Sequence, residues 1–303
     1  MPHAVPGAIE TLIDEGSFEP SGDALPVADP LSFPGYRDAL ERAQATSGSA
    51  ESVVTGPARI GDMAVEVAWF DFSFMGGSLG SRTGELLARA LERSARRGVP
   101  FVLRTATGGA RMQEGVTSLV QMPKVVAARL ELAAAHQPFV AVLGHPTTGA
   151  VLASLAGLAD VTVAEDGATI GFAGPRVVEA ATKRRLSPDS HTAATAFAAG
   201  LVDAVAARDH ARGVVASALA ILTAPEPATT APPIEPPAPR GGDGRGTVAT
   251  VRSPGWPRAP ELARALAGSF FELRGDRAQG DDEAIVAGFG KLDGRTLVLV
   301  GQQ

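Results

Sequence analysis

Cysteine is absent from the 303-residue chain, and aromatic residues make up only 5% of it. Without cysteine, no disulfide and no thiolate metal site can form, so a cytoplasmic location is the default expectation. Because aromatic side chains are few, a buried core must be built mainly from alanine, valine and leucine. A hydrophobic content of 45% is ample for such a core.

The chain also lacks long apolar runs and an excess of basic residues. No stretch of 18 consecutive apolar residues occurs, which predicts no membrane span. The first six residues lack the basic and apolar regions of a signal peptide. The net charge of −6 argues against a nucleic-acid binder, because such proteins are usually basic. We therefore expect a globular protein with neither nucleic acid nor membrane as a partner.

Short strands alternate with helices along the chain, which is typical of an α/β protein. Pro123 lies inside one expected helix and should kink or split it. Periodicity alone leaves open whether the sheet is flat or wound into a spiral. The apolar pattern predicts helices near 8–13 and 36–45 and over 80–96, 116–135, 149–159, 193–199 and 209–223, and strands over 64–70, 100–105, 139–143, 160–164 and 169–172.

Residues 224–248 are rich in proline and then in glycine, which is typical of a linker that is stiff at first and flexible later. A proline-rich ligand for another protein is the alternative. The linker would separate a domain over 51–223 from a segment over 249–303, where Thr296–Val300 predicts a strand. Residues 1–50 are polar and would form an N-terminal extension.

Two blocks place small residues directly after an apolar run. Residues 105–115 read Thr-Ala-Thr-Gly-Gly-Ala-Arg-Met-Gln-Glu-Gly, and residues 145–150 read His-Pro-Thr-Thr-Gly-Ala. Each block predicts a strand, a tight glycine turn and a helix N-terminus. Backbone N–H groups at two such turns could stabilise an oxyanion without a catalytic side chain. Two ordinary strand–helix turns are the alternative interpretation.

The order of several long motifs carries a family resemblance. Over about residues 8–205 the chain resembles the carboxyltransferase beta subunit of bacterial-type acetyl-CoA carboxylase. From about residue 259 to residue 303 it resembles the start of the partner alpha subunit, so it looks like a beta–alpha fusion that stops early. The motifs lie at 14–19, 29–33, 71–81, 108–115, 146–150 and 170–179 for the beta part, and at 270–277, 281–288 and 301–303 for the alpha part.

The resemblance implies a crotonase-type spiral of ββα units, followed by an incomplete second crotonase-like domain. Members of the family commonly carry a four-cysteine zinc ribbon near the N-terminus. This chain has no cysteine to form one, so no metal site is expected.

The resemblance also implies an activity. A carboxyltransferase of this family moves the carboxyl group from carboxybiotin to acetyl-CoA and yields malonyl-CoA. No cofactor would be bound covalently. The implied partners are an acyl-CoA, a biotin carboxyl carrier protein, a biotin carboxylase, and a carboxyltransferase alpha half or second copy within an oligomer. In the family the alpha half supplies a second oxyanion hole, which receives biotin. The alternatives are an acyl-CoA or malonyl-thioester decarboxylase subunit of the same superfamily and a non-catalytic, truncated assembly subunit.

Residue by residue, the resemblance places oxyanion donors in the two glycine turns. Arg111 would orient the first turn or contact a CoA phosphate, and Glu114 would act as a base or complement a helix dipole. Ala150 stands where the family often has glycine, which requires a negative φ. His145 is taken as a turn residue. The expected catalytic residues are Gly108, Gly109, Ala110, Gly149 and Ala150, and the expected substrate-binding residues are Gly76, Gly77, Ser78, Arg111, Met112, Gln113, Thr148, Phe172, Ala173 and Gly174.

Overall fold

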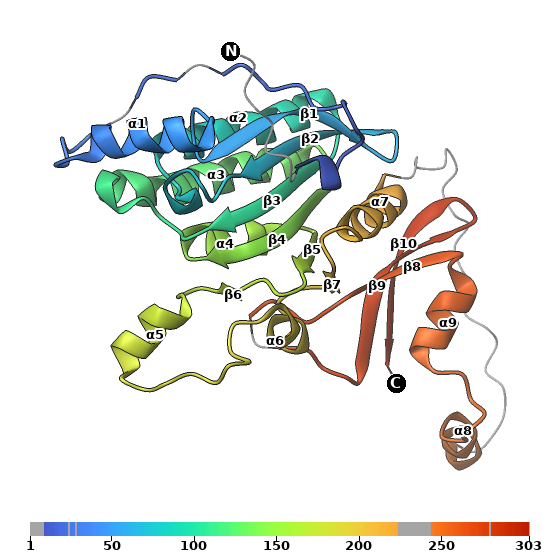
Figure 1. Ribbon diagram of the computed structural model, residues 1–303. Helices are drawn as coiled ribbons and strands as arrows, with labels where there is room; N and C mark the ends of the chain where they lie inside the picture. Colours follow the sequence, from blue (N-terminus) through green and yellow to red (C-terminus); the bar gives the residue numbers. More distant parts are fainter. Residues whose placement is uncertain (1–8, 24, 28, 224–243, 279, 303) are drawn as a thin grey trace. The chain divides into compact units, whose positions relative to one another are not determined.

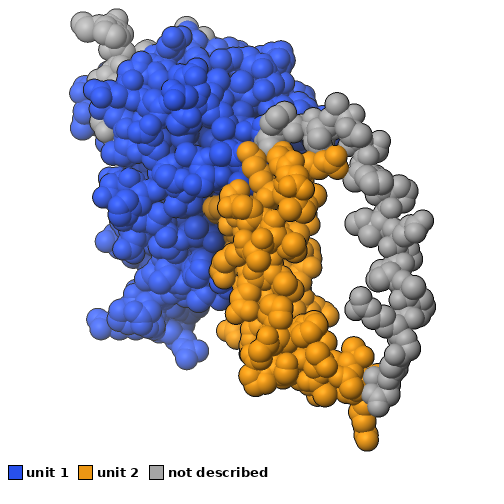
Figure 2. Space-filling model, turned by 90° about the vertical axis from the view of Figure 1, so that its right-hand side faces the viewer, with its two compact units in different colours: residues 1–223, 274–281 blue, residues 224–273, 282–303 orange. Residues whose placement is uncertain are grey.

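The computed structural model describes residues 9–23, 25–27, 29–223, 244–278 and 280–302. The chain divides into two compact units (Figure 2). The first comprises Met1–Thr223 with Arg274–Asp281, and the second comprises Ala224–Leu273 with Asp282–Gln303. Most of the expected linker, 224–243, lies outside the described residues. Its last residues, 244–248, lie in helix α8 (Gly244–Val251), and the boundaries of the linker stay a prediction.

A seven-stranded sheet forms the centre of the first unit (Figure 1). Its main path runs β1-β2-β3-β4-β5-β7, and β6 pairs with β4 outside that path. Only β1 and β2 pair antiparallel, and every other pairing is parallel. The strands are β1 (Val53–Ile60), β2 (Met63–Phe70), β3 (Phe101–Thr107), β4 (Phe139–Thr148), β5 (Val161–Glu165), β6 (Ile170–Gly171) and β7 (Ala204–Ala206).

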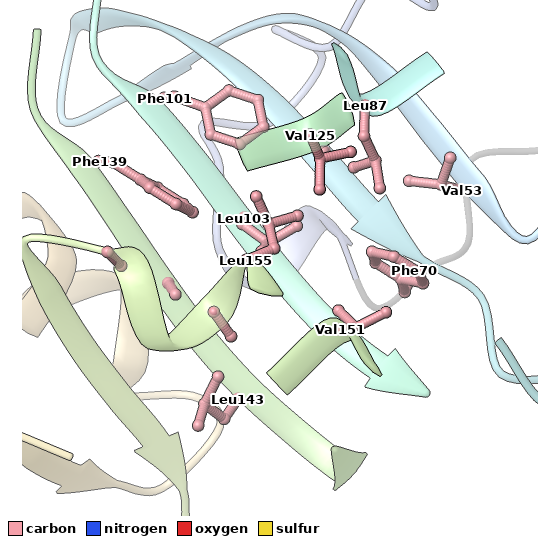
Figure 3. Packing of buried hydrophobic residues seen from close by; sticks show 14 of the residues in the cluster. Val53, Phe70, Leu87, Phe101, Leu103, Val125, Phe139, Leu143, Val151 and Leu155 are labelled. Atoms are coloured by element: carbon pink, nitrogen blue, oxygen red, sulfur yellow. The ribbon is translucent and has the colours of Figure 1, made fainter. Parts of the chain in front are cut away.

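Helices connect these strands and bury their apolar faces against the sheet. The main core unites side chains of α2 (Ser81–Arg97), α3 (Val116–Ala134) and α4 (Ala150–Ser154) with alternate residues of β2, β3 and β4 (Figure 3). Phe101 and Phe139 meet edge to face within it, at 5.3 Å between ring centroids. The remaining elements of this unit are η1 (Ile9–Thr11), α1 (Tyr36–Ser47), η2 (Met75–Gly77), η3 (Met112–Glu114), η4 (Ala156–Leu158), α5 (Pro175–Thr182), α6 (Ala193–Ala198) and α7 (Ala211–Leu222).

Several of the described residues before residue 51 are buried in the first unit. Ile9 and Ile13 are fully buried, and Tyr36 on α1 is 1% exposed. Tyr36 and Leu40 pack with Phe74, which directly precedes η2. Helix α1 therefore packs against the residues at the start of the glycine-containing loop at residues 76–81.

The second unit contains a three-stranded antiparallel sheet in the order β10-β9-β8. Its strands are β8 (Ser269–Leu273), β9 (Ile285–Leu292) and β10 (Arg295–Gln302), and α9 (Ala259–Leu266) packs against them. The predicted strand at Thr296–Val300 lies within β10. Phe271 and Phe289 stack face to face, at 5.2 Å between centroids.

Strand β1 and helix α3 are among the elements that differ from the sequence-based expectation. Strand β1 was missed because Gly56 and Pro57 interrupt its pattern. The proline is tolerated there because β1 lies at the edge of the sheet. Helix α3 is not split, since it runs from Val116 to Ala134 through Pro123, which is exposed; a kink at Pro123 stays a prediction. Among the described residues, no helix is long and apolar enough to cross a membrane.

Candidate active site

The two predicted glycine turns touch each other. Gly109, after β3, and Gly149, after β4, have positive φ angles of 105° and 71°. A Cβ atom built on Gly149 would lie 2.9 Å from the Gly109 Cα, and one built on Gly109 would lie 3.3 Å from the Gly149 Cα. Both positions therefore require glycine, because of the backbone angle and because of the close approach.

Three of the five expected N–H donors are already engaged. The Gly108 N–H donates to the Gly76 carbonyl (2.9 Å), and the Gly149 N–H donates to the Phe172 carbonyl (2.8 Å). The Gly109 N–H donates to the Thr107 hydroxyl (3.0 Å).

The N–H groups of Ala110 and Ala150 remain, and neither has a partner among the residues that the structure describes. Each follows directly after one of the glycines in contact. Ala150 is the first residue of α4 and is not among the residues with positive φ. Its methyl group packs into the core, so alanine in place of the glycine common in the family causes no strain.

Threonine hydroxyl groups brace the two turns from inside the sheet. Thr107 accepts the Gly109 N–H, and the Thr148 hydroxyl donates to the Thr107 carbonyl (3.3 Å). The hydroxyl groups of Thr105 and Thr147 lie 2.7 Å apart, one strand from the other. These contacts direct the Gly109 N–H inward and leave that of Ala110 as the available donor of the first turn.

Replacing Thr107 with valine tests this bracing. We expect Thr107→Val to lower kcat for carboxyl transfer about tenfold, because the Gly109 N–H loses its acceptor at a cost of about 1–3 kcal/mol. Thr107→Ser, which keeps the hydroxyl group, should retain most of the rate. Steady-state kinetics on a complete enzyme would measure both variants. Equal rates for the two would contradict this role.

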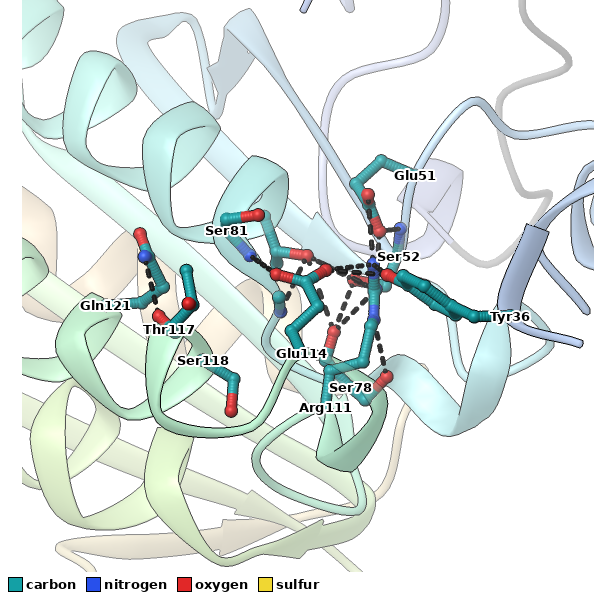
Figure 4. A network of polar contacts seen from close by, with 12 residues as sticks. Tyr36, Glu51, Ser52, Ser78, Ser81, Arg111, Glu114, Thr117, Ser118 and Gln121 are labelled. Carbon is teal, nitrogen blue, oxygen red and sulfur yellow. Dashed lines mark hydrogen bonds and ion pairs between the residues drawn. The ribbon is translucent and has the colours of Figure 1, made fainter. Parts of the chain in front are cut away.

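Arg111, the residue after Ala110, is held inside the protein (Figure 4). It is 1% exposed. Its Nη2 lies 2.5 Å from Glu51 Oε1 and also donates to the Ser78 carbonyl (2.8 Å), while its Nε donates to the Ser78 hydroxyl (3.0 Å). Burial raises the pKa of Glu51, but the charge and hydrogen bonds of Arg111 outweigh it and hold that pKa below its ordinary value. Arg111 therefore clamps the 76–81 loop onto the turn.

Glu114 stabilises the start of a helix other than the one expected. It belongs to η3 and accepts hydrogen bonds from the Ser81 N–H (2.7 Å) and the Tyr36 hydroxyl (2.6 Å). Its carboxylate thus complements the N-terminus of α2 rather than that of α3. Burial and the hydrogen bond to Glu114 raise the pKa of Tyr36, although the charge of Arg111 opposes them.

The remaining predicted substrate-binding residues differ in how far they are buried. Gly76, Gly77 and Ser78 pack against the first turn, and a Cβ at Gly77 would lie only 1.9 Å from the Ala106 carbonyl oxygen. The side chains of Met112 and Phe172 are 85% and 72% exposed. Thr148 is buried beside the second turn, and Gln113, Ala173 and Gly174 are half-buried.

The chain matches the carboxyl transferase domain over residues 7–303. It belongs to the carboxyl transferase family. The beta/alpha acetyl-coenzyme A carboxylase carboxyl transferase of Salinispora tropica is 41% identical over 312 residues, which cover 98% of this chain and 55% of that protein. The beta subunit of Fusobacterium nucleatum is 43% identical over 207 residues, 68% of each chain. This carboxyl transferase chain thus spans about half the length of its fused relatives.

Solved structures agree with the family and confirm the crotonase-like α/β fold. Transcarboxylase 12S, with methylmalonyl-coenzyme A and methylmalonic acid bound, superposes with a TM-score of 0.73 at 25% identity, over 98% of this chain and 56% of that one. A Pseudomonas malonate decarboxylase heterodimer gives a TM-score of 0.53 at 28% identity, over 72% of this chain and 85% of that one.

The motifs did not point to Glu51, Tyr36 or Thr107 as residues that hold the first turn. Glu51 and Tyr36 lie outside the quoted motifs, and no local pattern marks a residue that acts across 60 or more positions. Thr107 lies within the first block, but its spacing does not indicate which N–H its hydroxyl would accept.

We expect the purified chain to hold no stoichiometric zinc. It has no cysteine, and the described residues contain no group of three or more potential metal ligands among histidine, aspartate and glutamate. Elemental analysis of the purified protein would test this. One zinc ion per chain would show that the prediction is wrong.

Proposed function

We propose that this chain is the carboxyltransferase component of an acyl-CoA carboxylase that converts acetyl-CoA to malonyl-CoA. The observation that carries the proposal is that the N–H groups of Ala110 and Ala150, beside the contact between Gly109 and Gly149, have no partner in the part of the chain that the structure describes. The match to the carboxyl transferase family over residues 7–303 supports it.

The chemistry needs an oxyanion site more than it needs a catalytic side chain. When the α-carbon of a thioester loses a proton, negative charge develops on the carbonyl oxygen, and preorganised N–H donors stabilise it. The Ala110 and Ala150 N–H groups would donate to that oxygen. Their fixed backbone positions mean that little reorganisation is needed as the charge forms.

Carboxybiotin on a separate carrier protein would supply the carboxyl group and, once CO2 has left, a nitrogen base. The α-carbon then forms its new bond to CO2, and its proton passes to that nitrogen. No catalytic histidine or lysine is needed at the turns, and His145, at the start of the second block, accepts the Thr169 N–H (3.2 Å). Acyl-CoA, the biotin carboxyl carrier protein, a biotin carboxylase and an alpha half or second copy are the proposed partners.

The proposed substrate contacts are the loop at Gly76–Ser78 and the rims of the two turns. Met112 and Gln113 stand after the first turn, while Thr148, Phe172, Ala173 and Gly174 stand around the second. Arg111 we propose as a positioning residue rather than a contact to CoA phosphate, because its guanidinium is occupied by Glu51 and Ser78.

A malonyl-thioester decarboxylase is the second candidate, and the resemblance to malonate decarboxylase favours it in part. The transcarboxylase superposition covers more of the chain with a higher TM-score, so we prefer carboxyl transfer. Two assays separate the candidates: carboxyl transfer between malonyl-CoA and biocytin, and decarboxylation of a malonyl thioester without biotin. Decarboxylation alone would refute the proposal.

The fused relatives are nearly twice as long as this chain, so we expect full transfer to need the rest of their length. The 303-residue chain with a biotinylated carrier should form little malonyl-CoA, and an intact alpha half added in trans should restore the rate. Product formation can be followed with labelled bicarbonate after a biotin carboxylase step. Robust activity of the chain alone would contradict this expectation.

A further inference from the structure

One short segment of the chain is assigned to a different unit from the residues on either side of it in the sequence. Residues Arg274–Asp281 group with the first compact unit, although β8 before them and β9 after them belong to the second. We call the described residues of this stretch, Arg274–Ala278 with Gly280 and Asp281, the docking segment. We propose that it is a docking element that fits a preformed surface on the first unit and attaches the C-terminal part of the chain without help from the covalent linker.

The centre of the receiving surface is Asp203, a carboxylate whose side chain is 1% exposed. Its Oδ1 accepts the Arg274 N–H (3.0 Å), and its Oδ2 accepts both the Thr162 N–H (2.7 Å) and the Arg277 Nη2 (2.7 Å). Two of these three donors come from the docking segment. Without that segment, Asp203 would keep the hydrogen bond from the Thr162 N–H of β5 and lose its ion pair with Arg277.

Arg277 reaches further into the same surface. Its Nη1 donates to the Ala159 carbonyl and its Nη2 to the Asp160 carbonyl (3.3 Å), at the start of β5. The backbone of Arg277 has a φ of 59°, a conformation that non-glycine residues rarely adopt. Such strain persists only where the surrounding contacts outweigh it. Here the contacts are those of the Arg277 guanidinium with the carbonyl groups of Ala159 and Asp160 and with the Asp203 carboxylate.

The shapes of the two sides also match. A Cβ atom built on Gly275 would lie 2.5 Å from the Gly200 Cα, and one built on Gly200 would lie 2.7 Å from the Gly275 Cα. The guanidinium of Arg274 lies over the ring of Phe197, 5.1 Å from its centroid. Because Gly200 and Gly275 touch, a segment with a larger side chain in place of Gly275 would not fit this surface. The cation–π contact of Arg274 with Phe197 lies beside this pair of glycines.

The docking segment is also organised from within. Asp281 accepts the Gly275 N–H (2.9 Å) and pairs with Arg274 (3.1 Å). Asp276 accepts the N–H groups of Ala278 (2.8 Å) and Gly280 (3.1 Å). Because these bonds lie within the segment, less conformational entropy is lost when it docks, which favours binding.

The occupant is therefore this chain's own segment. The chain resembles both fused beta/alpha relatives and separate beta subunits. A docking surface of this kind makes a covalent linker unnecessary for holding the two parts together, which agrees with the occurrence of both arrangements among the relatives.

Cutting the full-length chain between the two parts tests the proposal. A specific protease site is inserted within residues 224–243, the folded protein is cleaved, and the N-terminal piece is captured by a tag. We expect the wild-type C-terminal piece to be retained. Arg277→Ala should weaken retention about a hundredfold, because it leaves the buried Asp203 carboxylate without its cation. Gly275→Val should weaken it as well, because the side chain would meet Gly200.

Arg264→Ala on α9 is the matched control, because it removes an arginine outside the docking segment and should leave retention unchanged. Hydrogen exchange of the Arg274 amide in the uncut chain gives a second measurement, slow in the wild type and fast in Arg277→Ala. Loss of the wild-type piece on cleavage, or equal retention of all variants, would overturn the proposal. Neither measurement uses enzymatic activity, so the result is independent of the proposed function.

Discussion

Replacing Gly109 with valine should lower the rate of carboxyl transfer about a hundredfold, a loss of roughly 3 kcal/mol of transition-state stabilisation. Gly109 has a φ of 105° and touches Gly149. A β-branched side chain cannot adopt that angle without strain, and it would push the two turns apart. The N–H of Ala110 would then no longer be aimed at the oxygen on which charge develops.

The effect on rate should exceed the effect on stability. Local backbone strain of this kind costs of the order of 1–3 kcal/mol, so the variant should remain folded. Gly213→Ala in α7 is the matched control, because a Cβ there meets open space and the residue is helical. The measurement is kcat/KM in a complete enzyme, beside thermal unfolding of each variant. Unchanged turnover in Gly109→Val would refute the assignment of this turn.

The sequence was most informative where its local pattern and the fold agree. Strands such as Phe101–Thr107 and Phe139–Thr148 are fully or largely buried, so their apolar runs are easily detected. The glycine turns follow them directly, and positive φ angles at Gly109 and Gly149 explain why glycine is needed there. The two turns could therefore be named in advance.

The choice of donors within the turns could not be made from sequence. It depends on the Thr107 hydroxyl, which occupies the Gly109 N–H, and on the Phe172 carbonyl, which occupies the Gly149 N–H. The second of these contacts spans 23 residues and arises from the β4–β6 pairing. Periodicity contains no information on such pairings, so the sequence left Gly109 or Ala110, and Gly149 or Ala150, as open pairs.

Ionic contacts between residues far apart in the chain likewise could not be predicted from the sequence. The sequence predicts that Arg111 orients the turn or contacts CoA, but it does not reveal the partner, Glu51, which stands 60 positions earlier. The docking segment shows the same limit, since Asp203 and Arg277 are 74 positions apart. In both cases a charged residue is buried only because a distant partner is buried with it.

Glu51 should be among the most sensitive positions for stability in the chain. Its carboxylate and the Arg111 guanidinium are each 1% exposed and meet through two hydrogen bonds. Removing Glu51 takes the shorter ion pair away from the buried Arg111 and leaves it with Glu114, 3.6 Å away, as a partner, at a cost of about 3 kcal/mol. We expect Glu51→Ala to lower the melting temperature by about 10 °C.

A surface pair serves as the control. Arg96 and Glu92 are 65% and 38% exposed, and Arg96→Ala should change stability by less than about 1 kcal/mol. A double variant, Glu51→Leu with Arg111→Met, should be more stable than Glu51→Ala, because it removes both members of the pair while Glu114 keeps its hydrogen bonds from Tyr36 and Ser81. The double variant should nevertheless lose activity, since Ser78 and the turn at Ala110 would no longer be clamped.

The pH dependence of stability gives a further check on the same pair. The folded protein holds the pKa of Glu51 below its ordinary value of 4.5, so the folded state favours the carboxylate. The stabilisation is therefore present at neutral pH and is lost as the pH falls below about 4.5. Glu51→Gln, which cannot titrate, should show a shallower fall in melting temperature over that acid range than the wild type. Parallel curves for the two proteins would show that the Glu51–Arg111 pair contributes little to the fold.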